Sequence, residues 1–439
     1  MILAAIYALT LVNALTAVYA LRRYATRDSV LQFFFVIVWM MHYVIGNVLV
    51  LLSSDRTYNF VPFAEYEAGY LASMVAGQYF LWVYLFLLDS TAKPVAGYRP
   101  LRAASLPIVL LFLAITGAFG ALLVLQIGVS EYFSQDLAQY RARLGEVSAG
   151  IGYFYYLATF LISATLVACA FAITNPRPRN IAIAVAAVIV AGILFVPLGG
   201  RGRLVNIVFV VALAYIISWR DFRLAKLFDK RLIALVGAVF ALSFVWGTLR
   251  ESREAVLPTD FTQVTASFAI DTSRLPFQAF VLERYPVSGV YYGIHYAESL
   301  MGPFYETFGF EPVRLIQQYS SRWYGETLGA PDLQSAISPS FLGETYLNFG
   351  FLGLVFAPFL FVAIMQGARA LGRADNAMSL AIVIYFFQFN LFHGGLYLSF
   401  DMLVITVPAL LVCNLLTERG PAGPPQARLM PPAGWKPAR

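Results

Sequence analysis

The chain has 439 residues, of which 60% are hydrophobic and 12% are charged, and its mean hydropathy is +0.71. A soluble globular protein carries about twice that charged fraction, so the composition excludes this class. The net charge of +6 does not indicate a nucleic-acid partner, because the basic residues lie in short linkers between apolar runs.

Apolar runs of about 20 residues recur along the chain, and each is long enough to cross a bilayer as a helix. Lipid cannot satisfy exposed backbone groups, so these runs are expected to be helical and the fold class all-α and polytopic. The first run precedes its basic residues, which predicts a retained helix instead of a cleaved signal. The sequence predicts about eleven spans, at 2–21, 30–52, 70–88, 106–127, 151–173, 181–198, 204–219, 232–249, 341–366, 377–395 and 399–416.

The basic residues are distributed unevenly between alternate linkers. Six segments hold 19 of the 30 Lys and Arg residues: 22–29, 89–105, 174–180, 219–231, 367–376 and the tail from 417. The positive-inside rule places these segments in the cytoplasm, with the N-terminus outside and the C-terminus inside. The basic residues expected outside are all arginines, which bind phosphate well as bidentate donors, although the chain is also rich in arginine throughout.

Four regions are expected along the chain. Residues 1–249 form transmembrane helices one to eight, 250–340 form a large periplasmic cap, 341–416 form helices nine to eleven, and 417–439 form a disordered cytoplasmic tail. The 250–340 segment is too long and too aromatic for a structureless linker, so we expect short amphipathic helices in it. Its aromatic residues suit either glycan stacking or anchoring at the membrane interface.

Two arginine-containing patches are candidate anion sites. Arg201 and Arg203 follow Gly199 and Gly200 at the outer end of the sixth span, where glycines permit close approach and the next helix N-terminus adds a positive field. A tight hairpin with snorkelling arginines explains the same spacing. Arg274 follows Asp271 in the large loop, and a surface ion pair is the alternative there.

Candidate acid–base residues are His295 in the large loop and His393 at the outer end of the tenth span, since histidine titrates near neutral pH. His42 lies inside the second span and is interpreted as a hydrogen-bonded core residue. Glu344, at the start of the ninth span, either complements the helix dipole or orients a sugar hydroxyl or an arginine.

No cluster has metal-ligand spacing, and the nearest approach to one is the isolated pair Glu65 and Glu67. Cys169 and Cys413 both fall in apolar runs and are interpreted as small core residues. The expected spans are apolar at depth and their polar residues gather at the outer rim. That pattern favours catalysis at the surface over transport through the bundle.

Four patches together resemble the O-antigen polymerases, which polymerise oligosaccharide repeat units. They are Gly199–Gly202, Asp271–Arg274 with Phe277–Tyr285, Tyr291–Pro303, and the most specific, Ser338–Gly353. The resemblance spans about 195–410, and the first five spans add only hydropathy and count. The family commonly has arginine followed by glycine at the outer end of the penultimate helix, where this chain has His393-Gly394. That histidine either replaces the cation or acts as a base.

The resemblance implies a fold related to the O-antigen ligases and a GT-C-like glycosyltransferase architecture in the bacterial inner membrane. It implies an inverting transfer at the periplasmic face, without metal or cofactor, between two undecaprenyl-diphosphate-linked oligosaccharides that serve as donor and acceptor. Membrane lipid and a chain-length regulator protein are the other partners it implies. The rival hypotheses are an O-antigen ligase, a metal-dependent transferase using Glu65 and Glu67, and a transporter of lipid-linked oligosaccharide.

For that chemistry, Arg201 and Arg274, assisted by Arg203, are expected to hold the departing diphosphate. His295 is the first candidate for the general base, and His393 and Glu344 are the alternatives. Further contacts to glycan or phosphate are expected from Arg250, Arg253 and Arg322.

Overall fold

The computed structural model describes residues 2–25, 29–52, 57–58, 61–62, 66–91, 98–132, 149–195, 201–218, 274–284, 293, 296, 339–372, 376–395 and 400–418. These residues are helical apart from turns, linkers and a small antiparallel hairpin of β1 (Thr57–Tyr58) and β2 (Val61–Pro62). The helices are α1 (Ile2–Arg23), α2 (Val30–Met40), η2 (Met41–Ile45), α3 (Gly46–Leu52), α4 (Glu67–Thr91), η4 (Ala103–Ser105), α5 (Leu106–Ile127), α6 (Val129–Tyr132), α8 (Ala149–Thr174), α9 (Pro178–Phe195), α10 (Arg201–Ser218), α13 (Leu275–Arg284), α16 (Ser340–Gly372), α17 (Ala377–Ile382), η8 (Val383–Asn390), α18 (Leu391–Gly394) and α19 (Phe400–Leu416).

Eight helices within the described ranges are long and apolar enough to cross a membrane, and Asn206–Ser218 and Met402–Leu416 are shorter apolar helices. Many large side chains on these helices are exposed and hydrophobic, among them Leu15, Phe86 and Leu125, as expected of a surface that faces lipid. The prediction of an all-α, multi-pass membrane protein is therefore confirmed. The expected span at 232–249 and most of the 250–340 segment lie outside the described residues.

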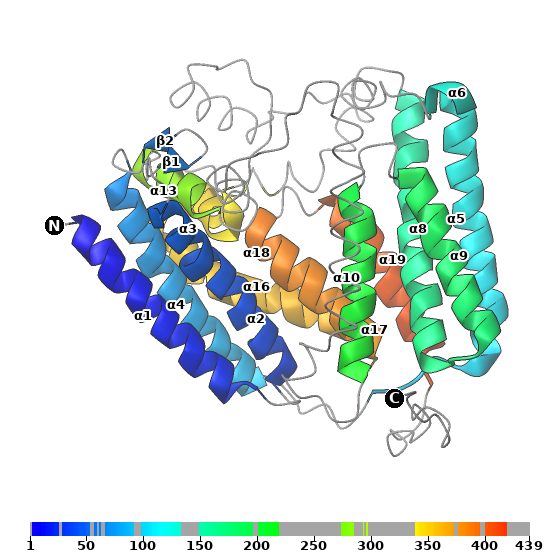
Figure 1. Ribbon diagram of the computed structural model, residues 1–439, viewed down its shortest axis with the longest axis horizontal. Helices are drawn as coiled ribbons and strands as arrows, with labels where there is room; N and C mark the ends of the chain where they lie inside the picture. Colours follow the sequence, from blue (N-terminus) through cyan, green and yellow to red (C-terminus); the bar gives the residue numbers. More distant parts are fainter. Residues whose placement is uncertain are drawn as a thin grey trace, which may run out of the picture.

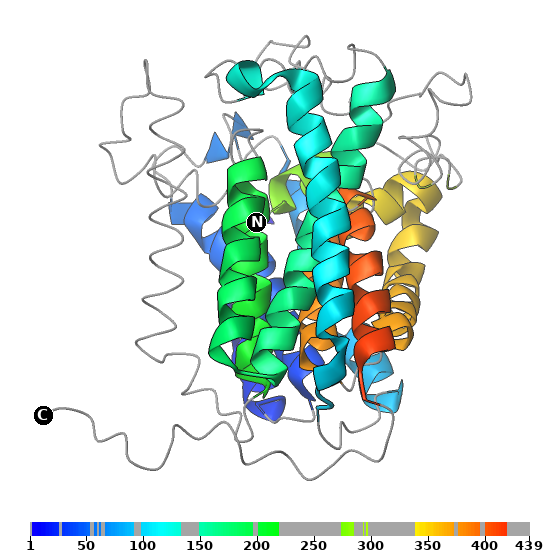
Figure 2. The same cartoon turned by 90° about the vertical axis from the view of Figure 1, so that its right-hand side faces the viewer.

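The helices run between two common ends in a broad bundle (Figures 1 and 2). In Figure 1, α1, α2, α3 and α4 form one side, α5, α8 and α9 form the other, and α10 with the α16–α19 segments lies between them. The short helix α13 lies near the upper end, where it packs against α4 and α16.

Hydrogen bonds join several linkers at the lower end of the bundle in Figure 1. The backbone of Leu101 pairs with that of Thr417, and the side chain of Asn175 donates to the carbonyl oxygen of Leu101 (3.0 Å). At the same end, Asp89 accepts hydrogen bonds from Tyr24 (2.8 Å) and, as an ion pair, from Arg23 (3.3 Å). The described parts of four of the six basic segments (22–29, 89–105, 174–180 and the segment from 417) therefore lie at one end of the bundle.

Polar side chains lie at the middle of the first helices, which corrects the expectation that the spans are apolar at depth. Gln78 of α4 donates to Oδ1 of Asn13 in α1 (2.6 Å), and Asn47 of α3 donates to Thr10 of α1 (2.7 Å). Trp39 of α2 donates to the carbonyl oxygen of Gly77 in α4 (2.8 Å). These side chains bond to one another because hydrocarbon offers them no partner, and they join α1, α2, α3 and α4.

A break within α16 shapes the upper end of the bundle. Gly350 has φ 60° and ψ −143°, a backbone conformation open mainly to glycine, and it divides the helix into two segments. A Cβ on Gly353 would lie 1.9 Å from the carbonyl oxygen of Thr345, so the two segments approach through backbone atoms. The first segment, which begins at Ser340, is almost entirely buried.

Candidate functional site

Arg274 occupies the residue before α13, and the packing of that helix fixes its position. Its carbonyl oxygen accepts the backbone N–H of Gln278 (3.0 Å), which begins the helix. Farther along α13, the carboxylate of Glu283 accepts the backbone N–H of Gly69 at the start of α4 (3.0 Å). A Cβ on Gly69 would lie 2.1 Å from the carbonyl oxygen of Ala279, so α13 and α4 are in backbone contact.

The described structure brings Arg274 together with two histidines. The guanidinium Nε–H of Arg274 donates to Nε2 of His393 (3.1 Å), and Nδ1 of His393 lies 3.0 Å from Nε2 of His42. The backbone N–H of Arg274 points at Nδ1 of His42 (3.3 Å). His42 is 3% exposed, whereas Arg274 and His393 are half-buried. A cation thus touches an imidazole pair near the upper end of a membrane bundle.

Each histidine is positioned by a π-helical segment. His42 lies within η2, between α2 and α3, and His393 lies in α18, directly after η8. A π-helical turn is wider than an α-helical turn and shifts the direction in which the following side chains point, and such turns are frequent at functional sites. Hydropathy does not report turn type, so this feature was not visible in the sequence.

Aromatic rings hold both imidazoles and extend toward α10. Phe392 contacts the His42 ring edge-on at a centroid distance of 5.4 Å, and Phe389 stacks on His393 at 5.8 Å. Tyr385 stacks on Phe389 at 5.6 Å and donates its hydroxyl hydrogen to Oδ1 of Asn206 in α10 (2.5 Å). The η8–α18 segment is therefore tied to the helix that begins at Arg201.

Glu344 places a carboxylate beside the end of α18. It lies in the first segment of α16 and is fully buried. A Cβ on Gly395 would lie 2.3 Å from its carboxyl carbon, so the carboxylate rests against the backbone that directly follows α18. Burial and then the charge of Glu344 raise the pKa of Tyr296 well above its ordinary value. Tyr296 therefore stays protonated beside the carboxylate.

A second polar cluster lies one helical turn along α13 from Arg274. The side-chain oxygen of Gln278 accepts hydrogen bonds from the hydroxyls of Tyr43 (3.2 Å) and Ser340 (3.0 Å), which join η2, α13 and α16. Gln278 is 1% exposed, and its Nε2 has no hydrogen-bond partner among the described residues. Tyr43 adjoins His42 in the chain, so this cluster braces the same π-helical turn.

The predicted site residues have different outcomes. Arg274 and His393 are in contact, and His42, interpreted from the sequence as a core residue, joins them. Glu344 lies against the backbone of Gly395, two residues after His393. Ionisable side chains inside apolar spans are commonly functional, and that signal could have singled out His42. Arg201 and Arg203 begin α10, but their side chains lie outside the described part. Four further predicted residues lie wholly outside it: His295, Arg250, Arg253 and Arg322.

The candidate metal pair is only partly described, because Glu67 begins α4 and Glu65 lies outside the described residues. Among the residues that the structure describes, no three His, Cys, Asp or Glu side chains gather as a group that could hold a metal ion. Cys169 and Cys413 are free and buried, as the sequence predicted.

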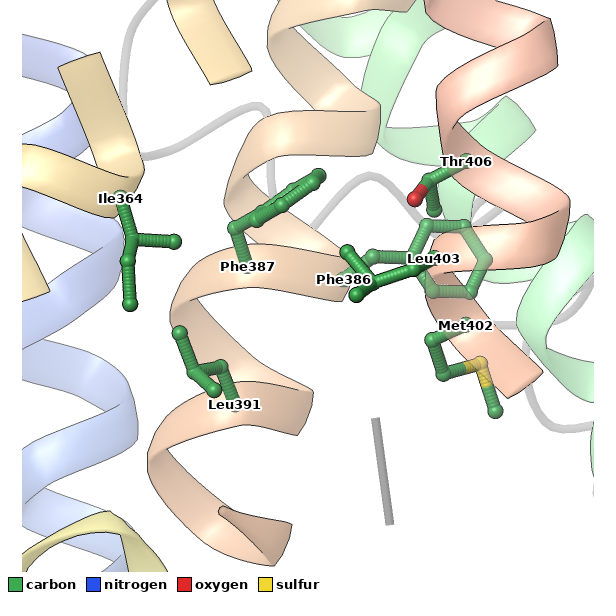
Figure 3. Close-up of a pocket in the computed structure, with 7 residues that line it drawn as sticks. All are labelled: Ile364, Phe386, Phe387, Leu391, Met402, Leu403 and Thr406. Carbon is green, nitrogen blue, oxygen red and sulfur yellow. The ribbon is translucent and has the colours of Figure 1, made fainter. Parts of the chain in front are cut away.

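A small apolar cavity adjoins the η8–α18 segment. Figure 3 shows Phe386, Phe387 and Leu391 facing it from that segment, Thr406 from α19 and Ile364 from α16. Met402 and Leu403 complete the lining. The walls are apolar apart from the Thr406 hydroxyl, so this cavity suits hydrocarbon and not a diphosphate.

Comparisons with protein-family models, with curated proteins and with solved structures find no match for the chain. The resemblance to the O-antigen polymerases is therefore unsupported by these comparisons and stays a prediction.

Proposed function

We propose that the protein is a membrane glycosyltransferase that polymerises undecaprenyl-diphosphate-linked oligosaccharide repeat units at the periplasmic face of a bacterial inner membrane. The observation that carries the proposal is the contact between the Arg274 guanidinium and His393 near the upper end of the bundle. Transfer from a lipid diphosphate to a sugar hydroxyl needs a fixed cation for the leaving group and a base for the nucleophile. This pair supplies both.

In the proposed reaction, a hydroxyl oxygen of the acceptor glycan attacks the anomeric carbon of the donor glycan. The bond from that carbon to the diphosphate oxygen breaks with inversion, and the lipid diphosphate leaves with the electron pair. Arg274 stabilises the charge that develops on the leaving group, and Arg201 and Arg203 at the start of α10 add to this field. The hydroxyl proton passes to Nε2 of His393.

In the structure, the Nε–H of Arg274 donates to this same nitrogen, so Arg274 covers Nε2 of His393. A diphosphate is a stronger acceptor for guanidinium than a neutral imidazole, so the arriving donor substrate draws Arg274 away and uncovers the base. Glu344, against the end of α18, is the proposed orienting group for a sugar hydroxyl.

The rival proposal of a transporter gains nothing from the polar side chains at the middle of α1 and α4. Gln78 and Asn13 bond to each other across the helix interface, as side chains that hold helices together do. An O-antigen ligase is separated from a polymerase by its product. A polymerase lengthens lipid-linked glycan, whereas a ligase moves glycan to the lipid A core.

The test replaces Arg274 in a strain that depends on this chain for surface glycan. Arg274→Ala should abolish polymer of modal length and lower turnover by about 10²-fold or more, because one preorganised donor to the leaving group is lost. Arg274→Lys keeps the charge without the bidentate fork and should rescue only part of the activity. Gel analysis of the glycan and the membrane content of each variant are the measurements.

The matched control is Arg284→Ala at the other end of α13. Arg284 lies over the ring of Tyr66 at 5.4 Å and is far along the helix from the histidines, so polymer length should be unchanged. Normal long-chain glycan from Arg274→Ala, at a normal protein level, would refute the proposal.

A further inference from the structure

His42 contacts both of the other members of the cluster. Its Nε2 lies 3.0 Å from Nδ1 of His393, and its Nδ1 faces the backbone N–H of Arg274 at 3.3 Å. The three residues come from distant parts of the chain, since His42 is 232 positions from Arg274 and 351 from His393. A buried side chain with these contacts fixes how the other two groups meet.

The number of protons on the two rings restricts the arrangement. Two neutral imidazoles carry two ring protons, one on each ring. One proton lies between Nδ1 of His393 and Nε2 of His42. Only one of the two outer nitrogens, Nε2 of His393 and Nδ1 of His42, can therefore be without a hydrogen. Both outer nitrogens nevertheless face an N–H of Arg274, Nε2 of His393 at 3.1 Å and Nδ1 of His42 at 3.3 Å.

The guanidinium contact decides which nitrogen is bare. It is the shorter of the two, and a hydrogen bond from a charged donor is about twice as strong as one from a neutral amide. Nε2 of His393 is therefore the acceptor. The proton of His393 then lies on Nδ1 and points at Nε2 of His42. His42 carries its own proton on Nδ1, so in this state the 3.3 Å contact with the backbone N–H of Arg274 is not a hydrogen bond.

We propose that His42 is a positioning residue that, together with the Arg274 guanidinium, holds His393 as the Nδ1-protonated tautomer, with the lone pair of Nε2 directed at the reacting hydroxyl. The catalytic consequence rests on the proposed function of His393 as the base. With the opposite tautomer, Nε2 would carry a hydrogen and could not accept the hydroxyl proton. The partner of one ring nitrogen commonly selects the reactive state of the other.

The packing around His42 supports a specific orientation of the ring and not mere filling of space. Phe392 meets the imidazole edge-on, with 86° between the ring planes, and His42 lies within the π-helical turn η2. Phe392 is also the residue before His393. The same contacts therefore hold the His42 ring and the chain that carries the base.

Ring-nitrogen NMR tests the tautomer without any assay of activity. The chain has three histidines, so protein labelled with ¹⁵N-histidine in lipid nanodiscs can be assigned with His295→Gln and His393→Gln variants. In the otherwise unchanged protein, His393 should be protonated on Nδ1 and bare on Nε2. In His42→Ala it should shift to a mixture containing the Nε2-protonated form. His42→Gln, whose amide oxygen can accept from Nδ1, should restore the first state.

Turnover gives the second readout. His42→Ala should lower kcat by about 10- to 100-fold and change KM little, because the reactive form of the base is lost while substrate contacts remain. His42→Gln should recover most of that loss. Val38→Ala, one turn earlier in α2 and also buried, is the packing control and should leave both the tautomer and kcat near their original values.

An unchanged His393 tautomer in His42→Ala would overturn the positioning role, whatever the activity. An Nε2-protonated His393 in the unsubstituted protein would overturn it as well. If the NMR results are as expected but the purified protein lengthens no lipid-linked glycan, the proposed polymerase function fails alone and the pairing of the two histidines stands.

Discussion

Gly395 allows a buried carboxylate to rest against the end of the helix that carries His393. Its φ is +66° with ψ −176°, a conformation that side chains rarely adopt, and the space where a Cβ would lie is already filled by Glu344. The glycine thus serves two purposes at one position. It ends α18, and it admits the carboxylate to the site.

Gly395→Ala should therefore displace Glu344 and reduce polymerisation strongly. The added Cβ would lie 2.4 Å from one carboxylate oxygen, and the backbone strain adds about 1–3 kcal/mol. Gly128→Ala is the matched control, because Gly128 has φ +93° but nothing lies within 4 Å of its added Cβ. Gly128→Ala therefore has the same kind of backbone strain but no steric clash with a neighbouring side chain. Glycan length and membrane content are measured, and equal activity of the two variants would refute the role of close approach.

The sequence was informative about single residues at this site and silent about their contacts. Arg274 was a candidate as a basic residue of the large loop, within a patch that resembles the polymerases, and His393 as a histidine at the outer end of the tenth span. Their hydrogen bond joins residues 119 positions apart, and no local pattern encodes such a pairing. His42 was predicted to be buried and hydrogen-bonded, which it is, but its partner is the candidate base.

At the scale of elements, hydropathy predicted most of the helices to within a few residues but did not predict their irregularities. The run at 377–395 is one continuous apolar segment, yet the structure divides it into α17, η8 and α18. The run that begins at 341 contains the break at Gly350. Turn type and breaks depend on tertiary contacts, and hydropathy does not report these.

The glycines of the Ser338–Gly353 patch have physical roles in that break. Gly350 supplies the left-handed backbone, and Gly353 lets the second segment of α16 touch the first. Gly343 closes the N-terminal turn, where a Cβ would lie 2.6 Å from that of Pro339. The glycines of the patch therefore determine the backbone conformation of the segment that holds Glu344.

Gly353→Ala should destabilise the protein by about 1–3 kcal/mol or more, because its Cβ would meet the backbone oxygen of Thr345, which has no rotamer to yield. Gly367→Ala, in the same helix with open space around the added Cβ, should be neutral or stabilising by up to about 1 kcal/mol. The measurement is the melting temperature of each purified variant. Similar melting temperatures for both would contradict the close approach of the two segments.

At the scale of the molecule, the alternation of basic linkers predicts which segments share one side of the membrane. Residues 99–102 lie against the end of α19, and the Asn376 side chain donates to the carbonyl oxygen of Arg99 (3.2 Å). Charge bias predicts only that such linkers lie at a common end of the bundle, and these particular contacts come from the structure. It could not predict the polar contacts between α1 and α4, which depend on helix rotation.

The proposed orientation places the end near Asp89 in the cytoplasm and the end near Arg274 in the periplasm, and cysteine labelling can test it. The native Cys169 and Cys413 are buried, so the unsubstituted protein provides the background. Ser90→Cys, at the end of α4, and Ser130→Cys, in α6, are conservative changes at exposed positions on opposite ends of the bundle. A membrane-impermeant maleimide should label Ser130→Cys from the periplasm, and Ser90→Cys only after the inner membrane is opened. The reverse pattern would put Arg274 and both histidines on the cytoplasmic side, where the proposed reaction does not take place.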